Sequence, residues 1–314
     1  MPKVSIIIPV YGVEKYIERC ARSLFEQTLN NLEYLFIDDC TPDNSIKILK
    51  RVLEEYPSRK EQTVIHRMEN NCGQALVRKW GMQNATGEYV IHCDSDDWVD
   101  TKMYEIMYEE AVAVNADVVV CDYYVVDEST KNYIAKGCHA TDNEKFVENL
   151  ILQRDSWSLW NKLFKRSVYS NKPILYPKGA MGEDLVICLQ LLLNSQRLAY
   201  LNKPYYYYYT NVNSITKKQS KDAIVKRFQQ SVANATILLD ICKQWNIYDK
   251  YKEDIDCILL NKKNLIRPLI GESVFYDIWK NTFPEINISI LWNKKISLKN
   301  KIRHILTFFR IYKQ

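Results

Sequence analysis

The chain has 314 residues, 47% of them hydrophobic and 26% charged, which suits one or two globular domains and excludes a disordered protein. No stretch approaches the roughly 18 continuous apolar residues of a membrane span. The nine cysteines contain no CxxC pair, which argues against a disulfide framework or a zinc site and favours a reducing, cytoplasmic compartment. The net charge of +5 is concentrated in residues 294–314, which carry seven basic residues and no acidic one, so no nucleic-acid partner is expected.

Strand and helix patterns alternate in the first part of the chain. The expected strands are 4–10, 34–37, 63–66 and 89–92, and the expected helices are 13–27, 45–55 and 74–84. Such alternation predicts an α/β fold with a Rossmann-like, mostly parallel sheet and helices on both faces.

The later elements extend this sheet and then give way to helices. We expect a helix over 101–115, a strand over 116–124, a hairpin or loop over 125–140, a short helix after residue 146, a helix over 184–194 and a strand over 205–209. The pattern beyond residue 220 is helical only. We therefore expect a boundary near residue 220, between an α/β domain over 1–220 and a helical C-terminal region over 221–314.

Acidic residues follow two of the predicted strands. Asp38 and Asp39 come after the second strand, and Asp94, Asp96 and Asp97 come after the fourth. Ligands bind at the carboxyl ends of strands in open α/β sheets, and like charges this close raise one another's pKa unless a cation lies among them. Oxygen ligands of this kind suit Mg²⁺ or Mn²⁺. The alternative is a solvated acidic turn before the next helix.

Several ordered motifs resemble those of the family 2 glycosyltransferases over about residues 1–215. They are VSIIIPVY at 4–11, FIDDCTPD at 36–43, NCG at 71–73 with Arg78 after it, GEY at 87–89 and DSDD at 94–97. The resemblance implies an A-type glycosyltransferase fold, with a nucleotide-sugar-binding catalytic domain over 1–220. It also implies inverting transfer of a sugar from a nucleotide-diphosphate donor, most often a UDP-sugar. The acceptor would be a glycan or a lipid-linked saccharide in the synthesis of a capsule or another cell-surface polysaccharide.

The same resemblance assigns the donor site. Pro9, Val10 and Tyr11 would line the nucleotide pocket, Asp39 would accept a hydrogen bond from the base, and Arg78 would lie near the phosphates. The alternatives are a Tyr11 side chain packed on the core and an Arg78 side chain on a solvated helix face.

The DSDD segment corresponds to the DxD motif of this fold. Asp94, Ser95 and Asp96 would contact the donor, with Asp96 and Asp97 as the candidate ligands of Mn²⁺ or Mg²⁺. The metal would bridge the diphosphate and neutralise the charge of the leaving nucleotide.

The later motifs concern the acceptor. Gly182-Glu183-Asp184 resembles the family's late acidic motif, in which Asp184 would be the catalytic base; the alternative is an acid that only stabilises a helix N-terminus. Trp157 and Trp160 would stack on acceptor sugars or belong to the core. The tyrosines of 205–209 would alternate between two faces of a strand, and the loop 210–218 would close over the diphosphate through Lys217 or Lys218.

The C-terminal tail is a predicted basic amphipathic helix. Its apolar face comprises Leu298, Ile302, Ile305, Leu306 and Phe309. Such a helix suits an anionic membrane surface, so the enzyme would be cytoplasmic with peripheral contact at the inner face of the membrane. The alternative is a helix whose apolar face packs on its own domain.

Two other functions compete with sugar transfer. A nucleotidyltransferase shares the sheet and the metal, but it would require a glycine- and lysine-rich early loop that residues 8–12 do not provide. A non-catalytic nucleotide- or glycan-binding module would keep the pocket without the chemistry.

Overall fold

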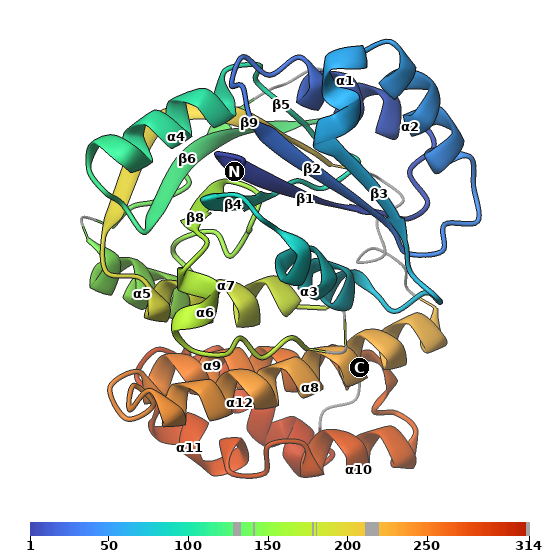
Figure 1. Cartoon of the computed structure of the whole chain (residues 1–314). Coiled ribbons are helices and arrows are strands. Elements are labelled where there is room, and N and C mark those ends of the chain that lie inside the picture. The colour runs from blue at the N-terminus through green and yellow to red at the C-terminus, as the bar shows by residue number, and fades with distance from the viewer. Residues whose placement is uncertain (128–132, 141, 178, 180, 211–219, 312–314) are drawn as a thin grey trace. The chain divides into compact units, whose positions relative to one another are not determined.

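The computed structural model describes residues 1–127, 133–140, 142–177, 179, 181–210 and 220–311. The chain divides into two compact units, Met1–Val212 and Asn213–Gln314. The first is built around a β-sheet, whereas the described part of the second consists of helices and turns (Figure 1). The assignment of separate functions to residues 1–220 and 221–314 stays a prediction.

Four parallel strands form one half of the sheet. They are β1 (Val4–Val10), β2 (Leu32–Asp38), β3 (Thr63–Arg67) and β4 (Tyr89–His92), in the spatial order β3-β2-β1-β4. Val10 lies opposite Asp38, and Ile7 lies opposite His92, so the carboxyl ends of β1, β2 and β4 reach the same edge. The four strands that the sequence predicts here are confirmed.

Helices cover both faces of these strands because successive side chains of β1 point to opposite sides. Ile6 and Ile8 pack in the core beneath α1 (Ile17–Phe25) and α2 (Ser45–Glu54), whereas Ile7 packs with α3 (Gln74–Asn84) on the other face (Figure 1).

The first helix begins later than residue 13, where the sequence pattern places its start. The backbone N–H groups of Val13 and Glu14 donate to side chains that follow β2, Ser45 Oγ at 3.1 Å and Asp43 Oδ2 at 2.9 Å. These hydrogen bonds hold the segment before the helix as a turn.

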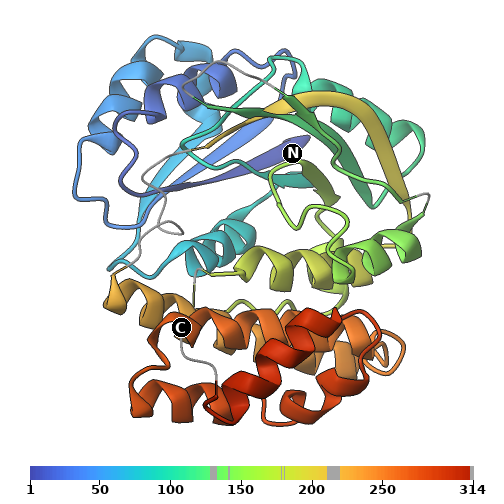
Figure 2. The same cartoon turned by 180° about the vertical axis from the view of Figure 1, so that it is seen from behind.

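The other half of the sheet mixes strand directions. It contains β5 (Trp98–Val99), β6 (Val118–Val126), β7 (Tyr133–Ala135), β8 (Lys162–Lys165) and β9 (Leu198–Tyr209). The order continues from β4 through β8, β6 and β9 to β5, with β7 paired to β6. β8 is antiparallel to both neighbours, whereas β9, the long yellow strand of Figure 2, runs parallel to β6. The predicted α/β fold is confirmed, and the sheet is mixed beyond β4.

The remaining elements of the first unit lie around this sheet. They are η1 (Pro57–Gln62), α4 (Met103–Ala113), α5 (Asn143–Ile151), α6 (Val168–Asn171) and α7 (Glu183–Asn194). β7 shows that part of the segment predicted as a hairpin or loop over 125–140 forms an antiparallel hairpin with β6. The strand predicted over 205–209 begins much earlier, at Leu198.

The second unit has its own hydrophobic core. Its elements are α8 (Lys221–Gln244), α9 (Lys252–Lys263), η3 (Asn264–Leu269), α10 (Ser273–Asn281), α11 (Ile286–Trp292) and α12 (Leu298–Phe308). Phe228, Ile266 and Trp279 are among the buried side chains that join α8, η3 and α10. No helix in the described ranges combines the length and the apolar character that a membrane span requires.

Candidate active site

The predicted donor residues meet at the carboxyl edge of the parallel strands. The backbone N–H of Asp39 donates to the carbonyl of Val10 at 3.1 Å, and the hydroxyl of Ser95 donates to the carbonyl of Pro9 at 2.6 Å. These bonds join the ends of β1, β2 and β4. Tyr11 follows β1 with 51% of its surface exposed, so the alternative of a core-packed Tyr11 does not hold.

Asp39 is held by the loop that precedes α3. Its carboxylate accepts hydrogen bonds from the backbone N–H groups of Cys72, at 2.8 Å, and Gly73, at 3.0 Å. Gly73 has a φ of 85°, a left-handed conformation that glycine adopts without strain, and it precedes the first residue of α3. The NCG motif therefore fixes the orientation of the Asp39 carboxylate.

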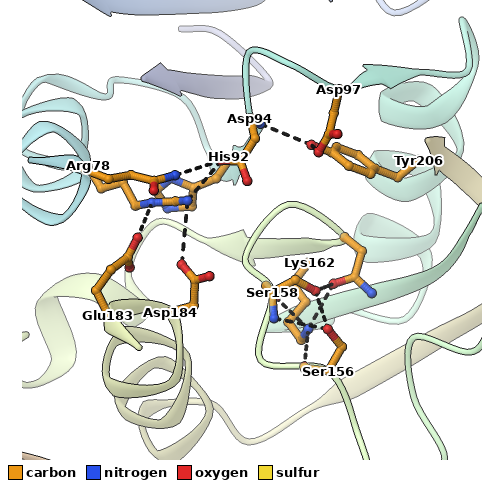
Figure 3. A network of polar contacts seen from close by, with 12 residues as sticks. Arg78, His92, Asp94, Asp97, Ser156, Ser158, Lys162, Glu183, Asp184 and Tyr206 are labelled. Atoms are coloured by element: carbon orange, nitrogen blue, oxygen red, sulfur yellow. Dashed lines mark hydrogen bonds and ion pairs between the residues drawn. The ribbon is translucent and has the colours of Figure 1, made fainter. Parts of the chain in front are cut away.

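Arg78 of α3 lies at the centre of a buried carboxylate cluster (Figure 3). Its side chain is 1% exposed, so the alternative of a solvated Arg78 is wrong. One terminal nitrogen, Nη2, lies 3.0 Å from Asp94 Oδ1 and 3.6 Å from Asp184 Oδ1, and Nε lies 3.3 Å from Glu183 Oε1. The guanidinium thus joins the end of β4 to the start of α7.

Burial and mutual repulsion shift the ionisation of this cluster. Burial raises the pKa of Asp94 to about 6, with Asp184 and Asp96 adding to the shift and Arg78 opposing it. Burial also raises the pKa of Glu183 well above its usual value, and the neighbouring Asp184 contributes. For Arg78 burial acts against the charge, but Glu183, Asp94 and Asp184 outweigh it and raise the pKa. The charge of Arg78 therefore offsets part of the cost of burying these carboxylates.

Asp184 occupies the first turn of α7, and Gly182 before it adopts a left-handed conformation with a φ of 84°. The Asp184 side chain is 42% exposed, whereas that of Glu183 is 2% exposed. Of the two acids in the motif, only Asp184 combines contact with Arg78 and access to solvent. That difference supports Asp184 over Glu183 as the candidate base.

The carboxylate of Asp97 holds two tyrosines of β9 in place. Its Oδ2 accepts a hydrogen bond from the hydroxyl of Tyr206 at 2.6 Å, and its Oδ1 accepts one from the backbone N–H of Tyr209 at 2.7 Å (Figure 3). The residue is 1% exposed, and burial raises its pKa well above the usual value, with Asp96 and Asp94 adding to the shift. Both oxygens therefore anchor β9 to the end of β4.

The Asp96 carboxylate makes no hydrogen bond with any other residue that the structure describes. Burial raises its pKa, so a nearby cation would stabilise the ionised form. No group of three or more His, Cys, Asp or Glu side chains within the described ranges could hold a metal ion by itself. One free carboxylate fits a cation that takes its other ligands from a diphosphate, which is a usual mode for Mg²⁺.

Arg19 of α1 is a site residue that sequence reasoning misses. Its guanidinium lies 3.7 Å from the centre of the Trp98 ring and donates from Nη2 to the backbone carbonyl of Asp96 at 2.9 Å. Burial lowers its pKa, and the carboxylate of Asp97 counteracts that shift. No local signal distinguishes Arg19, because a single basic residue on an amphipathic helix usually faces water.

The two candidate acceptor tryptophans differ. Trp160 is 6% exposed and stacks on Tyr206 with ring centroids 4.2 Å apart, so it belongs to the core and a sugar cannot stack on its covered face. Trp157 is half-buried, and its Nε1 donates to the carbonyl of Leu150 at 3.1 Å. Of the two, only Trp157 stays a candidate for acceptor contact.

The tyrosines of β9 contact different aromatic groups on its two sides. Tyr206 and Tyr208 stack on Trp160, whereas Tyr207 stacks on Trp98 and Tyr124. The predicted alternation is confirmed. The closing loop with Lys217 and Lys218 lies outside the described residues.

Lys162 is a second residue whose environment the sequence does not reveal. It is completely buried, and its Nζ donates to the carbonyls of Ser156, at 2.9 Å, and Ser158, at 2.7 Å, and to Asn161 Oδ1, at 2.9 Å (Figure 3). Burial lowers its pKa. The ammonium group organises the loop that carries Trp157 and Trp160.

Comparison with known proteins agrees with these observations. The chain matches the model of glycosyl transferase family 2 over residues 5–186. It is 30% identical over 263 residues to the uncharacterized glycosyltransferase EpsJ of Bacillus subtilis, covering 79% of this chain and 75% of EpsJ. It is also 30% identical over 229 residues to the glycosyltransferase GlyA of Streptococcus pneumoniae, covering 68% of this chain but only 32% of GlyA.

Solved structures share the fold. TarS of S. aureus, residues 1–349 in complex with UDP-GlcNAc, superposes with a TM-score of 0.61 at 18% identity, covering 84% of this chain and 81% of that chain. The mannosyltransferase PcManGT of Pyrobaculum calidifontis, in complex with GDP-Man and Mn²⁺, gives a TM-score of 0.54 at 13% identity, covering 98% and 86%.

Proposed function

The chain belongs to glycosyltransferase family 2, and on that premise we propose that it moves a sugar from a UDP-sugar to a hydroxyl group of a glycan or lipid-linked saccharide, with inversion. The observation that carries the proposal is the position of Arg78. One of its nitrogens contacts both Asp94, which follows β4, and Asp184, the candidate base. Donor recognition and proton removal are therefore assigned to groups in direct electrostatic contact.

Asp184 supplies the proton acceptor. The oxygen of the acceptor hydroxyl attacks the anomeric carbon, the bond from that carbon to the phosphate oxygen breaks, and UDP leaves. The hydroxyl proton passes to the Asp184 carboxylate. Arg78 acts as a positioning residue, because it holds the Asp184 side chain at the end of the donor site while remaining 1% exposed itself.

A divalent cation, when bound, neutralises charge on the diphosphate and on the leaving nucleotide. We assign it to Asp96, whose carboxylate has no hydrogen bond to another described residue, and not to Asp97, whose oxygens are both occupied. Mn²⁺ and Mg²⁺ both suit oxygen ligands, and PcManGT was solved with Mn²⁺. Metal dependence is thus part of the proposal.

Uracil recognition by Asp39 gives the first prediction. We expect the native chain to prefer UDP over CDP. The ring N3 of uracil carries a hydrogen and can donate a hydrogen bond to a carboxylate, whereas the ring N3 of cytosine cannot. In Asp39→Asn the affinity for UDP falls about tenfold or more, as expected for a lost charge-assisted hydrogen bond. Isothermal titration with both nucleotides measures the effect.

CDP is the internal control for that experiment. Loosening of the Cys72–Gly73 loop would weaken both nucleotides alike, whereas loss of base recognition removes only the preference for UDP. An unchanged UDP to CDP ratio in Asp39→Asn would contradict the role given to this carboxylate.

The cellular role that we propose is synthesis of a capsule or another extracellular polysaccharide on the cytoplasmic side of the membrane. The name of EpsJ describes a glycosyltransferase without a stated substrate, so the polymer itself rests on the family resemblance. All nine cysteines are free thiols, which agrees with a reducing compartment.

Peripheral membrane contact is also proposed, on the basis of α12. Its apolar side chains Leu298 and Ile302 are 73% and 47% exposed, and Phe309, which follows the helix, is 66% exposed, whereas the buried residues of the helix are His304 and Thr307. Leu306 of the predicted apolar face is half-buried, but the exposure of the other side chains supports lipid contact over packing of this face on its own unit. Basic residues on the same helix complement an anionic lipid surface.

Vesicle flotation tests this contact. We expect the native chain to float with phosphatidylglycerol vesicles but not with phosphatidylcholine vesicles, and Ile302→Ser with Phe309→Ser to reduce flotation about fivefold or more. Val274→Ser, which changes an exposed apolar residue of α10, is the matched control. Equal flotation of the control and the double variant would refute the contact.

The non-catalytic alternative is less well supported. A module that only binds a nucleotide needs no solvent-accessible carboxylate against Arg78, yet Asp184 occupies that position. The loop after β1 does not support a nucleotidyltransferase. Residues 11–14 contain no lysine for a triphosphate, and the backbone N–H of Gly12 donates to the hydroxyl of Thr41.

A further inference from the structure

The C-terminal unit contains a cavity of ≈ 380 Å³ that the proposed reaction does not use. Residues of α9, η3, α10 and α12 line it. This volume lies in the range of sites for small organic ligands and is far larger than one water molecule requires.

The wall of this cavity is basic and amide-rich. Arg267, Arg303 and His304 face it together with Asn261 and Asn300, and none of the lining residues is acidic. Arg267 Nη2 donates to the hydroxyl of Thr307 at 3.0 Å, so its guanidinium is held at the wall. Two guanidinium groups without a carboxylate in the lining favour an anion, and arginine suits phosphate because of its planar set of donors.

His304 is the second, independent observation. The residue is 5% exposed, and neither ring nitrogen has a hydrogen-bond partner among the described residues. Burial lowers its pKa to about 4, with Lys263 and Arg267 contributing, so the ring is neutral near pH 7 and carries one N–H donor. A buried polar group without a partner is costly, and a ligand in the cavity would supply that partner.

Lys263 strengthens the positive potential behind this ring. Its Nζ lies 4.7 Å from the centre of the Trp279 ring and is held by the carbonyl of Thr282 at 2.7 Å and by Asn287 Oδ1 at 2.7 Å. Since these bonds fix its ammonium group, Lys263 contributes charge from behind the wall, whereas Arg267, Arg303 and His304 supply donors at the cavity itself.

We infer that this cavity is a binding site for a sugar phosphate or polyol phosphate. The phosphate would contact Arg267, Arg303 and His304, and the amides of Asn261 and Asn300 would bind hydroxyl groups of the attached sugar or polyol. A bare phosphate would fill only part of the volume. The same chemistry exists in a free saccharide phosphate and in the phosphate-linked end of a lipid-bound saccharide. The lining residues belong to the C-terminal unit, whereas UDP binding is assigned to residues of the first unit.

Isothermal titration of the full chain with glucose 1-phosphate tests the inference, with glucose as the uncharged control. Arg303→Gln is expected to weaken binding about tenfold or more, as the loss of a charge-assisted hydrogen bond to phosphate implies. Lys299→Gln, an exposed basic residue of the same helix outside the cavity lining, is the matched control and keeps native affinity. His304→Gln provides a second variant at the buried ring.

Flotation distinguishes the two sources of the ligand. Phosphatidylcholine vesicles with a polyprenyl phosphate are compared with the same vesicles without it, for native chain, Arg303→Gln and Lys299→Gln. Retention that requires both the polyprenyl phosphate and Arg303 identifies the lipid-linked source, and glucose 1-phosphate binding without such retention identifies the free one. Equal behaviour of Arg303→Gln and Lys299→Gln in both experiments, or no binding by the native chain in either, would overturn the inference. The affinity for UDP is measured for every variant, and an unchanged value shows that the transferase site is intact.

Discussion

Replacing Asp184 by asparagine is expected to lower the rate of sugar transfer by about 10²- to 10⁴-fold, the usual contribution of a general base. The amide has the shape of the carboxylate but cannot take the hydroxyl proton. Arg78 keeps Asp94 and Glu183 as partners in this variant, so we expect the fold and the affinity for UDP to stay near native. Steady-state transfer and UDP titration measure the two quantities.

Glu183→Gln is the matched control, because Glu183 is the adjacent acid on α7 and contacts the same guanidinium. Its side chain is 2% exposed, compared with 42% for Asp184. We expect this variant to change the free energy of unfolding more than the rate of transfer. If Glu183→Gln abolishes transfer while Asp184→Asn retains most of it, the base is Glu183 and the assignment is reversed.

Replacing Arg78 by methionine has the largest expected effect on stability. The substitution leaves Asp94, Glu183 and Asp184 without their shared cation, and loss of one partner from a buried ion pair costs about 3–5 kcal/mol. Transfer should be lost as well, because Asp184 is no longer positioned. Chemical denaturation gives the change in the free energy of unfolding, and activity is measured where the variant is still folded.

The pH dependence identifies the cause of that loss. Burial already raises the pKa values of Asp94 and Glu183, and without Arg78 these values rise further, so the folded variant binds more protons than its unfolded chain as the pH falls. We therefore expect the loss of stability to be larger at pH 8 than at pH 5. Arg51→Met, which removes a 63% exposed partner of the 42% exposed Glu18, is the control and should cost about 1 kcal/mol or less at both pH values. A loss for Arg78→Met that is the same at both pH values would point to packing instead of charge.

The parallel half of the sheet and the strand-end acids could be predicted because both depend on local patterns. Short, nearly continuous apolar runs identify β1 and β2, and the rule for strand ends then brings Asp39 and Asp94 to one edge. Whether the carboxylate of each acid has hydrogen-bond partners could not be predicted in this way. Asp97 is saturated by Tyr206 and Tyr209, which lie more than a hundred positions later, whereas Asp96 is not.

Arg78 shows the same limit. A basic residue on a helix such as α3 usually faces water. Arg78 is buried only because the start of α7 approaches the end of β4 and brings Glu183 against its side chain. The four-residue strand β8 depends on pairing with β4 and β6, which are distant in sequence. The partners of the completely buried Lys162 are near it in the chain, but the sequence does not show that the loop folds around its ammonium group. The periodicity of α12 identified an apolar stripe correctly, but periodicity does not show which side of a helix is packed; here the packed side carries His304 and Thr307.

Release of UDP from a panel of UDP-sugars, with Mn²⁺ and in the presence of EDTA, is the decisive measurement of metal-dependent sugar transfer. We expect the native chain to release UDP from at least one donor, EDTA to stop the release, and Asp96→Ala to be inactive while the fold is kept. If the native chain binds UDP but releases none from any donor with or without metal, the chain is a nucleotide-binding module and the transferase assignment is wrong.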